Sequence, residues 1–135
     1  MESRFKELYM DIAHRVAKMS RAEKLKVGSI LVKDDRIISL SWNGTPSKWD
    51  NICEDEFGQT KPEVIHSEMN CILKLCRSHD SGNDATMFIT HAPCIHCAKA
   101  IYGAGITAVY YKTPYRDNSG IEFLKKCNVV IEQIT

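Results

Sequence analysis

Two short stretches of this chain carry the side chain types that bind transition metals. A His-x-Glu pair runs from His66 to Glu68, and a Pro-Cys-x-x-Cys stretch begins at Pro93 and holds Cys94 and Cys97. Imidazole and thiolate are common zinc ligands, and a catalytic zinc has three protein ligands and an open position for water. We therefore predict one zinc ion held by His66, Cys94 and Cys97. Glu68 is left over as a general acid and base that carries protons between water and substrate.

The spacing predicts two helices whose N-termini face the metal. Cys94 and Cys97 are three residues apart, so their sulfur atoms share one face of a helical first turn. Pro93 suits the mouth of that helix, where a missing N–H has no cost. The positive end of the helix dipole favours the ionised sulfur that zinc needs. His66 is expected to begin a second helix, which places Glu68 on the substrate side of the metal.

The same residue types occur in other kinds of site. A redox pair would leave the His-x-Glu unused, and a zinc ribbon requires a second Cys-x-x-Cys, which the sequence lacks. His96, between the cysteines, is a rival ligand, but its helical position points it away from the sulfur atoms, toward the site lining or solvent. A zinc-stabilised binding module without activity is a further alternative. Glu68 argues against it, because a structural zinc site has no use for this carboxylate.

Hydrophobic periodicity predicts the elements that must position these residues. Helices are expected over residues 3–19, from about 66 to 77, from about 94 to Gly103 or Gly105, and after a capping box of Ser119 and Glu122. Strands are expected over 26–33, 36–42, 85–90, 108–112 and 129–134, with a turn at Asp34-Asp35. Residues 47–64 are polar and irregular, and a loop of this length is usually functional. The order predicts a three-layer α/β/α fold, a five-stranded mixed sheet with helices on both faces.

The same patterns predict which side chains face the core. The first helix has an apolar stripe of Phe5, Leu8, Ile12, Val16 and Met19, and the helix after His66 has one of Met69, Ile72, Leu73 and Cys76. Cys71, Cys76 and Cys127 lie in apolar surroundings and are expected in the core. Asn70 is expected to be a hydrogen-bonded buried amide. Cys53 lies in the polar loop, where the sequence indicates no structural role for it.

Composition limits the class of protein. The 135 residues suit a single domain spanning 1–135, with 44% hydrophobic and 26% charged residues. A net charge of +1 provides no strong basic field for a nucleic acid partner, so a small nucleotide is favoured. No apolar run is long enough for a membrane span, and no signal peptide is evident. With two of the six cysteines assigned to zinc, the others are expected as reduced thiols in the cytoplasm.

Seven segments carry sequence patterns of one enzyme family. They are residues 26–32 (K-V-G-S-I-L-V), 36–39 (R-I-I-S), 42–46 (W-N-G-T-P), 66–72 (H-S-E-M-N-C-I), 85–90 (A-T-M-F-I-T), 93–101 (P-C-I-H-C-A-K-A-I) and 115–117 (Y-R-D). On these segments the chain resembles the cytidine and deoxycytidylate deaminase family, and within it the deoxycytidylate (dCMP) deaminases. Four residues depart from the family pattern: Ser67 stands where Ala is usual, Ser41-Trp42 where Gly-Tyr is usual, and Ala92 where Ser is frequent.

The resemblance implies a cytidine-deaminase-like fold and zinc-dependent hydrolysis of dCMP to dUMP and ammonia, which supplies dUMP for dTMP synthesis. It implies that Glu68 is catalytic and that substrate is bound by Asn43, Thr45, Ser67 and Tyr115. Candidate phosphate or effector contacts are Arg4, Lys26, Trp42, Gly44 and Arg116, with Arg21 and Lys48 as further basic candidates. Deaminases of free cytidine or deoxycytidine and of tRNA adenosine share the zinc motif. The first usually lack the long N-terminal helix and the Asn-Gly-x-Pro loop, and the second require a basic docking face.

The resemblance also implies regulation. In this family the loop that contains residues 42–46 serves allosteric control, so dCTP is expected to activate and dTTP to inhibit. A triphosphate effector normally arrives with Mg²⁺. The expected assembly is a homo-oligomer, specifically a hexamer.

Overall fold

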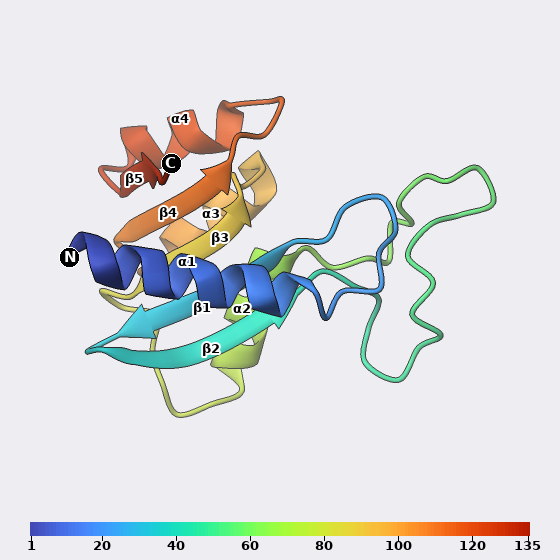
Figure 1. Cartoon of the computed structure of the whole chain (residues 1–135), viewed down its shortest axis with the longest axis horizontal. Coiled ribbons are helices and arrows are strands. Elements are labelled where there is room, and N and C mark those ends of the chain that lie inside the picture. Colours follow the sequence, from blue (N-terminus) through green and yellow to red (C-terminus); the bar gives the residue numbers. More distant parts are fainter.

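The computed structural model describes residues 1–135. Five strands form one mixed sheet, and four helices cover its two faces (Figure 1). Their bounds are α1 Ser3–Ala17, β1 Gly28–Lys33, β2 Arg36–Trp42, α2 Ser67–Cys76, β3 Thr86–His91, α3 Ile95–Gly103, β4 Ala108–Thr113, α4 Ser119–Lys126 and β5 Val130–Gln133. The strand order is β2-β1-β3-β4-β5. β1 is antiparallel to β2 and β3, whereas β3, β4 and β5 are parallel. The predicted three-layer fold class is confirmed.

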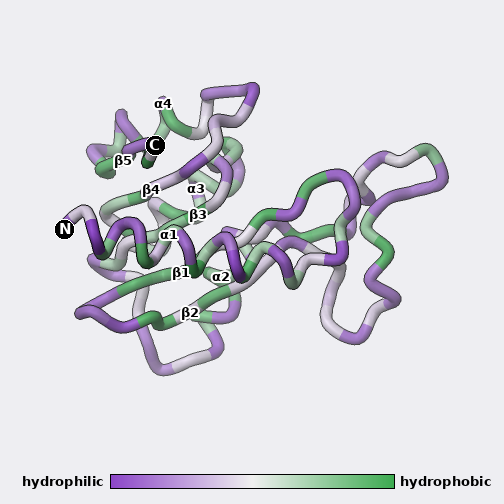
Figure 2. The backbone as a smooth tube through the Cα atoms, in the orientation of Figure 1, coloured by the Kyte–Doolittle hydropathy of each residue, from purple (hydrophilic) through white to green (hydrophobic).

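Two hydrophobic cores fill the space between sheet and helices. On one face α1 packs on the strands through Tyr9, whose ring centroid lies 5.3 Å from that of Phe88, which in turn stacks 5.2 Å from Tyr110. On the other face α2, α3 and α4 contribute Leu75, Ile101 and Leu124 to a larger core. Figure 2 shows hydrophobic residues along the central strands and hydrophilic residues at the turn between β1 and β2. No helix is long and apolar enough to cross a bilayer.

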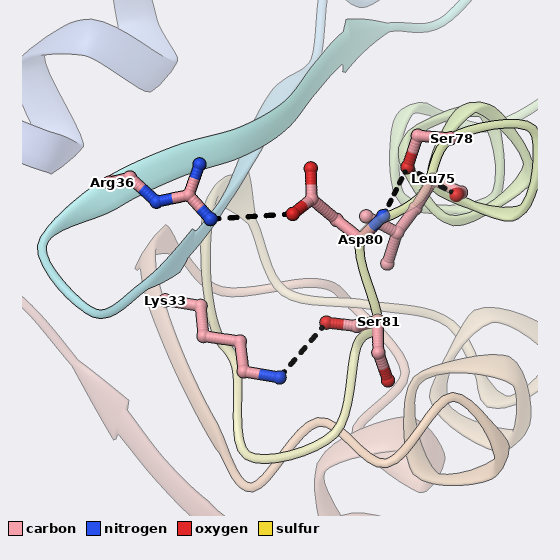
Figure 3. A network of polar contacts seen from close by, with 6 residues as sticks. All are labelled: Lys33, Arg36, Leu75, Ser78, Asp80 and Ser81. Carbon is pink, nitrogen blue, oxygen red and sulfur yellow. Dashed lines mark hydrogen bonds and ion pairs between the residues drawn. The ribbon is translucent and has the colours of Figure 1, made fainter.

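The β1–β2 hairpin closes at the end of the sheet away from the metal-binding motifs. Asp34 and Asp35 have φ values of 51° and 60°, the left-handed conformation that a two-residue type I′ turn requires. Arg36 contacts the Asp80 carboxylate at 3.3 Å, and the Lys33 ammonium lies 3.5 Å from the Ser81 carbonyl (Figure 3). These contacts tie the hairpin to the turn that follows α2. They are exposed, so each adds at most about 1 kcal/mol.

The buried faces of α1 and α2 agree with the prediction only in part: Phe5, Ile12 and Val16 of α1 and Ile72 of α2 pack on the cores as predicted. On α1 the buried stripe is Tyr9, Met10, Ala13, Val16 and Ala17. Leu8 and Met19 were predicted to face the core but are 47% and 52% exposed. Leu8 lies beside the stripe, and Met19 follows the end of the helix. Two overlapping apolar stripes are compatible with this sequence, and packing against the aromatic residues of the sheet selects the one that contains Tyr9.

α2 shows the same effect. The buried positions include Cys71, Ile72 and Leu75, whereas Leu73 and Cys76, predicted to face inward, are exposed. Leu73 and Cys76 are three residues apart, so they share the solvent side of the helix. Cys71 lies in the core as predicted, and Cys127 is half-buried. Asn70 is hydrogen-bonded as predicted, since its Nδ2 donates to the Trp42 carbonyl at 3.1 Å, but it is half-buried and not fully buried.

The start of α4 also differs from the prediction. The N-cap is Asn118, and Ser119 is the first helical residue, so Ser119 and Glu122 do not form a capping box. The backbone N–H of Ser119 instead donates to the Asp117 carboxylate at 2.9 Å. A carboxylate two residues upstream thus satisfies an amide at the helix start.

Long loops leave the sheet at the end where the metal-binding motifs lie. Residues 43–66 contain no helix or strand, only isolated bridges between Gly44 and Ile65 and between Glu54 and Thr60. They extend beside the connection between α1 and β1 (Figure 1), and the Glu54 carboxylate accepts the backbone N–H groups of Glu23 and Lys24 at 3.1 and 3.2 Å. The predicted irregular segment is therefore an ordered projection. Cys53 is buried within it.

Candidate active site

Three side chains from two helix starts converge to form a metal-binding cluster. His66 is the N-cap of α2, Cys94 is the N-cap of α3, and Cys97 lies in the first turn of α3. The His66 Nδ1 is 3.6 Å from the Cys94 Sγ and 3.4 Å from the Cys97 Sγ. All three donor atoms lie within 4.8 Å of one another. One imidazole and two thiol groups at this separation suit zinc, which prefers nitrogen and sulfur ligands in tetrahedral geometry.

The three side chains of the cluster shift one another's pKa values. A hydrogen bond from the Cys97 thiol is the main reason that the Cys94 pKa falls to about 3, with His66 adding to the effect. The pKa of Cys97 is raised in turn, first by this hydrogen bond to Cys94 and then by burial. The hydrogen bond to Cys94 also raises the His66 pKa. Zinc binds thiolates and neutral imidazole, so its binding to this cluster would release protons.

The first turn of α4 packs closely against the turn before α3. The predicted place of Pro93 is close to the observed one, because it precedes the Cys94 N-cap. A Cβ atom on Gly120 would overlap the Pro93 carbonyl oxygen and lie 2.9 Å from the Cys94 carbonyl carbon. Only a residue without a side chain allows this approach. Gly120 was not predicted as a site residue, because it is distant in sequence and carries no chemistry of its own.

Glu68 occupies the first turn of α2, two residues after His66. Its side chain is almost completely buried, with 4% of the residue exposed. Burial disfavours the carboxylate and raises the Glu68 pKa to about 7. A carboxyl group with this pKa can both accept and donate a proton near neutral pH.

Buried hydroxyl groups anchor the start of α2 to the sheet. The Ser67 Oγ lies 2.6 Å from the Ser29 Oγ on β1 and donates to the Ser41 carbonyl on β2 at 3.3 Å. Ser67 occupies a position where the family usually has alanine. The hydroxyl therefore adds a polar link that holds the residues on either side of it, His66 and Glu68, against the ends of two strands.

A cleft of about 780 Å³ opens beside the cluster. Its lining comes from the segment before β1, the loop between β2 and α2, the ends of β3 and β4, and the starts of α2 and α3. The lining residues are Lys24, Leu25, Val27, Asn43, Gln59, Thr60, Val64, His66, Ser67, Glu68, His91, Ala92, Cys94, Pro114, Tyr115 and Arg116. The cleft lies outside the carboxyl ends of parallel strands, where α/β sheets usually bind ligands.

Several residues predicted from the sequence meet in this cleft. Asn43, Ser67, Tyr115 and Arg116 all line it together with Glu68. Two protein hydrogen bonds already engage the Asn43 side chain, which accepts from the Val27 N–H at 2.9 Å and donates to the Leu25 carbonyl at 2.8 Å. The amide retains one N–H and one lone pair for a ligand. Asn43 thus shapes the wall formed by residues 25–27 while remaining able to contact a substrate.

The other predicted residues lie outside the cleft lining. Lys26 donates to the Ser20 carbonyl at 2.8 Å, and Gly44 exchanges two backbone hydrogen bonds with Ile65. The Trp42 ring packs near the Lys74 ammonium, and the Thr45 hydroxyl is buried without a partner. Arg4 pairs with Glu2 at the start of α1, and the N-terminus of the chain lies opposite the projecting loops (Figure 1).

Sequence reasoning missed part of the lining. Lys24 and Gln59 come from irregular segments whose folding no periodicity reveals, and the structure brings them together across the cleft. Neither Lys24 nor Arg116 takes part in an ion pair, so the Lys24 ammonium and the Arg116 guanidinium are available to bind a ligand. His91 could have been found, since it ends a strand just before the cysteine motif.

A second cavity of about 620 Å³ adjoins the loops. It is lined by Arg21, Glu23, Lys24 and residues of the loop between Asn51 and Gly58. Lys24 lines both this cavity and the cleft. The projecting loop therefore builds a second concave surface that shares a basic residue with the first.

Comparison with known proteins agrees with the cluster and the fold. Residues 3–113 match the model of the cytidine and deoxycytidylate deaminase zinc-binding region. The crystal structure of a dCMP deaminase from the cyanophage S-TIM5, in complex with dCMP and dUMP, superposes with a TM-score of 0.97 at 40% identity, covering 99% of both chains. ComE operon protein 2 of Bacillus subtilis is 32% identical over 95% of this chain and 70% of its own length. The deoxycytidylate deaminase of Saccharomyces cerevisiae is 28% identical, and this chain spans 44% of it. The chain therefore belongs to the cytidine and deoxycytidylate deaminase family.

Proposed function

We propose that this protein is a zinc-dependent deaminase that hydrolyses dCMP to dUMP and ammonia, within a single domain formed by residues 1–135. One observation carries the proposal: the cluster of His66, Cys94 and Cys97 lies beside a buried carboxyl group, Glu68, at a nucleotide-sized cleft. The match over 99% of a dCMP deaminase solved with dCMP and dUMP supports the choice of substrate. The product dUMP would serve synthesis of dTMP.

The proposed mechanism assigns the proton transfers to Glu68. His66, Cys94 and Cys97 would hold the zinc ion, which would lower the pKa of water toward about 7. Glu68, whose own pKa is about 7, accepts a proton from the attacking water and donates it to ring N3. Protonation of N3 makes C4 electrophilic, and the water oxygen bonds to C4. Glu68 then transfers the second water proton to the amino group, the C4–N bond breaks, and ammonia leaves.

The remaining lining residues hold the nucleotide in this proposal. The backbone at Ser67 contacts the base, and Tyr115 covers the sugar. Asn43 binds a sugar hydroxyl with the amide N–H and the oxygen lone pair that make no hydrogen bond within the protein. Lys24 and Arg116 bind the 5′-phosphate, because both line the cleft and neither has an ion-pair partner. This assignment keeps Arg116 from the sequence candidates and replaces Arg4 and Lys26 with Lys24.

Parallel assays of ammonia release test the proposal directly. The zinc-loaded protein is incubated with dCMP, deoxycytidine, cytidine, dCTP and an adenosine-containing tRNA. We expect dCMP to have the highest kcat/KM, since phosphate-binding groups left unpaired by a nucleoside cost binding energy. Equal values for dCMP and deoxycytidine would identify a nucleoside deaminase. Release from tRNA alone would identify an RNA-modifying enzyme.

Regulation and assembly extend the proposal. We infer that the protein is a homo-oligomer, specifically a hexamer, activated by dCTP and inhibited by dTTP, each bound with Mg²⁺. Support comes from the resemblance of residues 42–46 to the loop that serves allosteric control in this family, and from Lys24, which lines both the cleft and the second cavity. The lining of the second cavity also includes the carboxyl groups of Glu23, Glu54, Asp55 and Glu56. A ligand that repositions Lys24 changes both sites, and such coupling typically amounts to about 5–150-fold in affinity.

Turnover of dCMP titrated with dCTP and dTTP in the presence of Mg²⁺ tests the regulation. A mass measurement in solution tests the assembly. A monomer whose rate ignores both triphosphates would contradict the two extensions and leave the deaminase proposal intact.

A further inference from the structure

His91, the last residue of β3, lines the cleft and has a ring nitrogen, Nε2, that makes no hydrogen bond within the protein. Its ring lines the cleft and is half-buried, and its only side-chain hydrogen bond joins Nδ1 and the Thr90 hydroxyl oxygen at 3.1 Å. The Nε2 atom has no partner in the protein. Neither the metal cluster nor the proposed mechanism uses this ring.

Proton placement at Thr90 determines which nitrogen of His91 carries the hydrogen. The Thr90 hydroxyl oxygen, buried in the sheet, accepts the Gly28 backbone N–H at 3.1 Å. Its own hydrogen has one acceptor within reach, the His91 Nδ1. An Nδ1 atom that accepts cannot carry a proton in a neutral imidazole, so the hydrogen is on Nε2. Burial, together with the nearby His14, lowers the His91 pKa and keeps the ring neutral.

The strand register places His91 beside the segment of the cleft wall that carries Tyr115 and Arg116. His91 pairs with Thr113 of the parallel neighbour β4, and Thr113 is followed directly by Pro114, Tyr115 and Arg116. Burial and the nearby His14 of α1 are the causes that lower the His91 pKa, and Glu68 is not among them. A nucleotide whose base is at Glu68 must extend its sugar and phosphate along the rest of the cleft.

We propose that His91 is a specificity-determining residue whose Nε2–H donates a hydrogen bond to the 5′-phosphate of the bound deoxynucleoside monophosphate, beside Arg116. The proposal rests on the deaminase function above and adds a neutral, directional donor to the two charged groups. A neutral donor fixes the orientation of the phosphate group, whereas Lys24 supplies charge without a fixed direction.

Two substitutions separate the two nitrogen atoms of the ring. His91→Asn places an amide where Nδ1 lies, so it keeps an acceptor for Thr90 and removes the donor in the cleft. His91→Gln places an amide N–H near the Nε2 position and gives up the contact with Thr90. His79→Leu, in the exposed turn after α2, is the matched control for loss of a histidine.

The variants are compared in kcat/KM for dCMP and for deoxycytidine. We expect His91→Asn to lose about 10- to 100-fold with dCMP, mainly through KM, because a hydrogen bond to a charged group is lost. Its activity on deoxycytidine should change little, and His91→Gln should restore most of the activity on dCMP. Full activity of His91→Asn on dCMP, or an equal loss on both substrates, overturns the proposal.

A spectroscopic readout tests the same contact without catalysis. In long-range ¹⁵N–¹H spectra of the zinc-loaded protein, His91 should show the Nε2–H tautomer, and its Nε2 signal should shift with dUMP but not with deoxyuridine. An Nδ1–H tautomer, or equal shifts with both ligands, overturns the inference alone. A wild-type enzyme that releases no ammonia from dCMP overturns the proposed function, and the inference with it.

Discussion

Gly120 and Pro93 are in such close contact that a single added methyl group would separate them. A Cβ atom on Gly120 would overlap the Pro93 carbonyl oxygen, one residue before the metal-binding Cys94. The first turn of α4 therefore supports the backbone turn that aims the two sulfur atoms. Groups that orient metal ligands from behind commonly change metal affinity by about 10- to 100-fold when altered.

The first prediction is that Gly120→Ala weakens zinc binding. The added methyl group displaces the turn at Pro93 and Cys94, so affinity measured by competition with a chromogenic chelator should fall about 10- to 100-fold. The matched control is Gly103→Ala, since a Cβ at Gly103 meets no atom within 4 Å. Equal zinc affinity in the two variants would show that α4 does not support the turn.

The second prediction concerns the proton carrier. Glu68→Gln keeps the size of the side chain and the cluster of His66, Cys94 and Cys97, so it should retain one zinc per chain and bind dUMP. Turnover of dCMP should fall by about 10²- to 10⁴-fold or more, because Glu68 is proposed to transfer a proton twice. Glu63→Gln, an exposed position in the loop before α2, is the control. A Glu68→Gln rate within a few-fold of wild type contradicts the role.

The third prediction is a pH dependence of stability that arises from Cys71. Burial is the main cause that raises the pKa of this thiol from 9.0 to about 11. Because the folded state holds the proton more tightly than the unfolded state, the contribution is complete below about pH 9. It is lost as pH rises through 11, and a shift of this size corresponds to roughly 2–3 kcal/mol.

Urea unfolding of the zinc-loaded protein at pH 8, 9 and 10 measures this dependence. The slope against pH should be smaller in Cys71→Ala than in Cys76→Ala, since Cys76 is exposed. The comparison of variants removes the shared contribution of lysine titration. Parallel slopes in both variants would assign the alkaline loss to other groups.

A feature of this protein could be predicted from the sequence where residues close together in the chain determine it, and could not where tertiary packing determines it. The spacing of His66, Cys94 and Cys97 is a local property of two helix starts, so the cluster could be predicted, and hydrophobic periodicity predicted the five-stranded mixed sheet but not its strand order. The buried face of α1 could not be predicted, because Leu8 and Tyr9 are both apolar and only packing on Phe88 chooses between them. The cap of α4 was misassigned because Asp117, and not Ser119, provides the accepting oxygen.

The cleft shows the same limit for functional residues. Asn43 and Tyr115 were predicted through short motifs, and the structure brings both to the lining. Lys24 and Gln59 lie in loops without periodicity, and their meeting depends on contacts such as Glu54 with the Lys24 N–H. Arg4 was a reasonable candidate by charge alone. Distance along the fold, which no sequence pattern encodes, separates it from the cleft.

The last prediction tests which cations recognise the phosphate. Arg116→Met and Lys24→Met each keep a long apolar side chain and remove a charge that lines the cleft, so KM for dCMP should rise. Loss of a charged hydrogen bond typically costs about 1.5–3 kcal/mol, which corresponds to roughly 10- to 150-fold. The KM for deoxycytidine should change little, because this substrate has no phosphate.

Arg4→Met is the matched control. Arg4 is exposed, pairs with Glu2 and stacks on Phe5 at 4.9 Å, so its loss should leave kcat/KM for dCMP unchanged. Raising the salt concentration should weaken dCMP binding by the wild type more than by Arg116→Met, since screening acts on the charge that the variant lacks. If Arg4→Met alone raised KM for dCMP, the phosphate would have to be bound by the N-terminal end of α1, and the cleft assignment of Lys24 and Arg116 would be wrong.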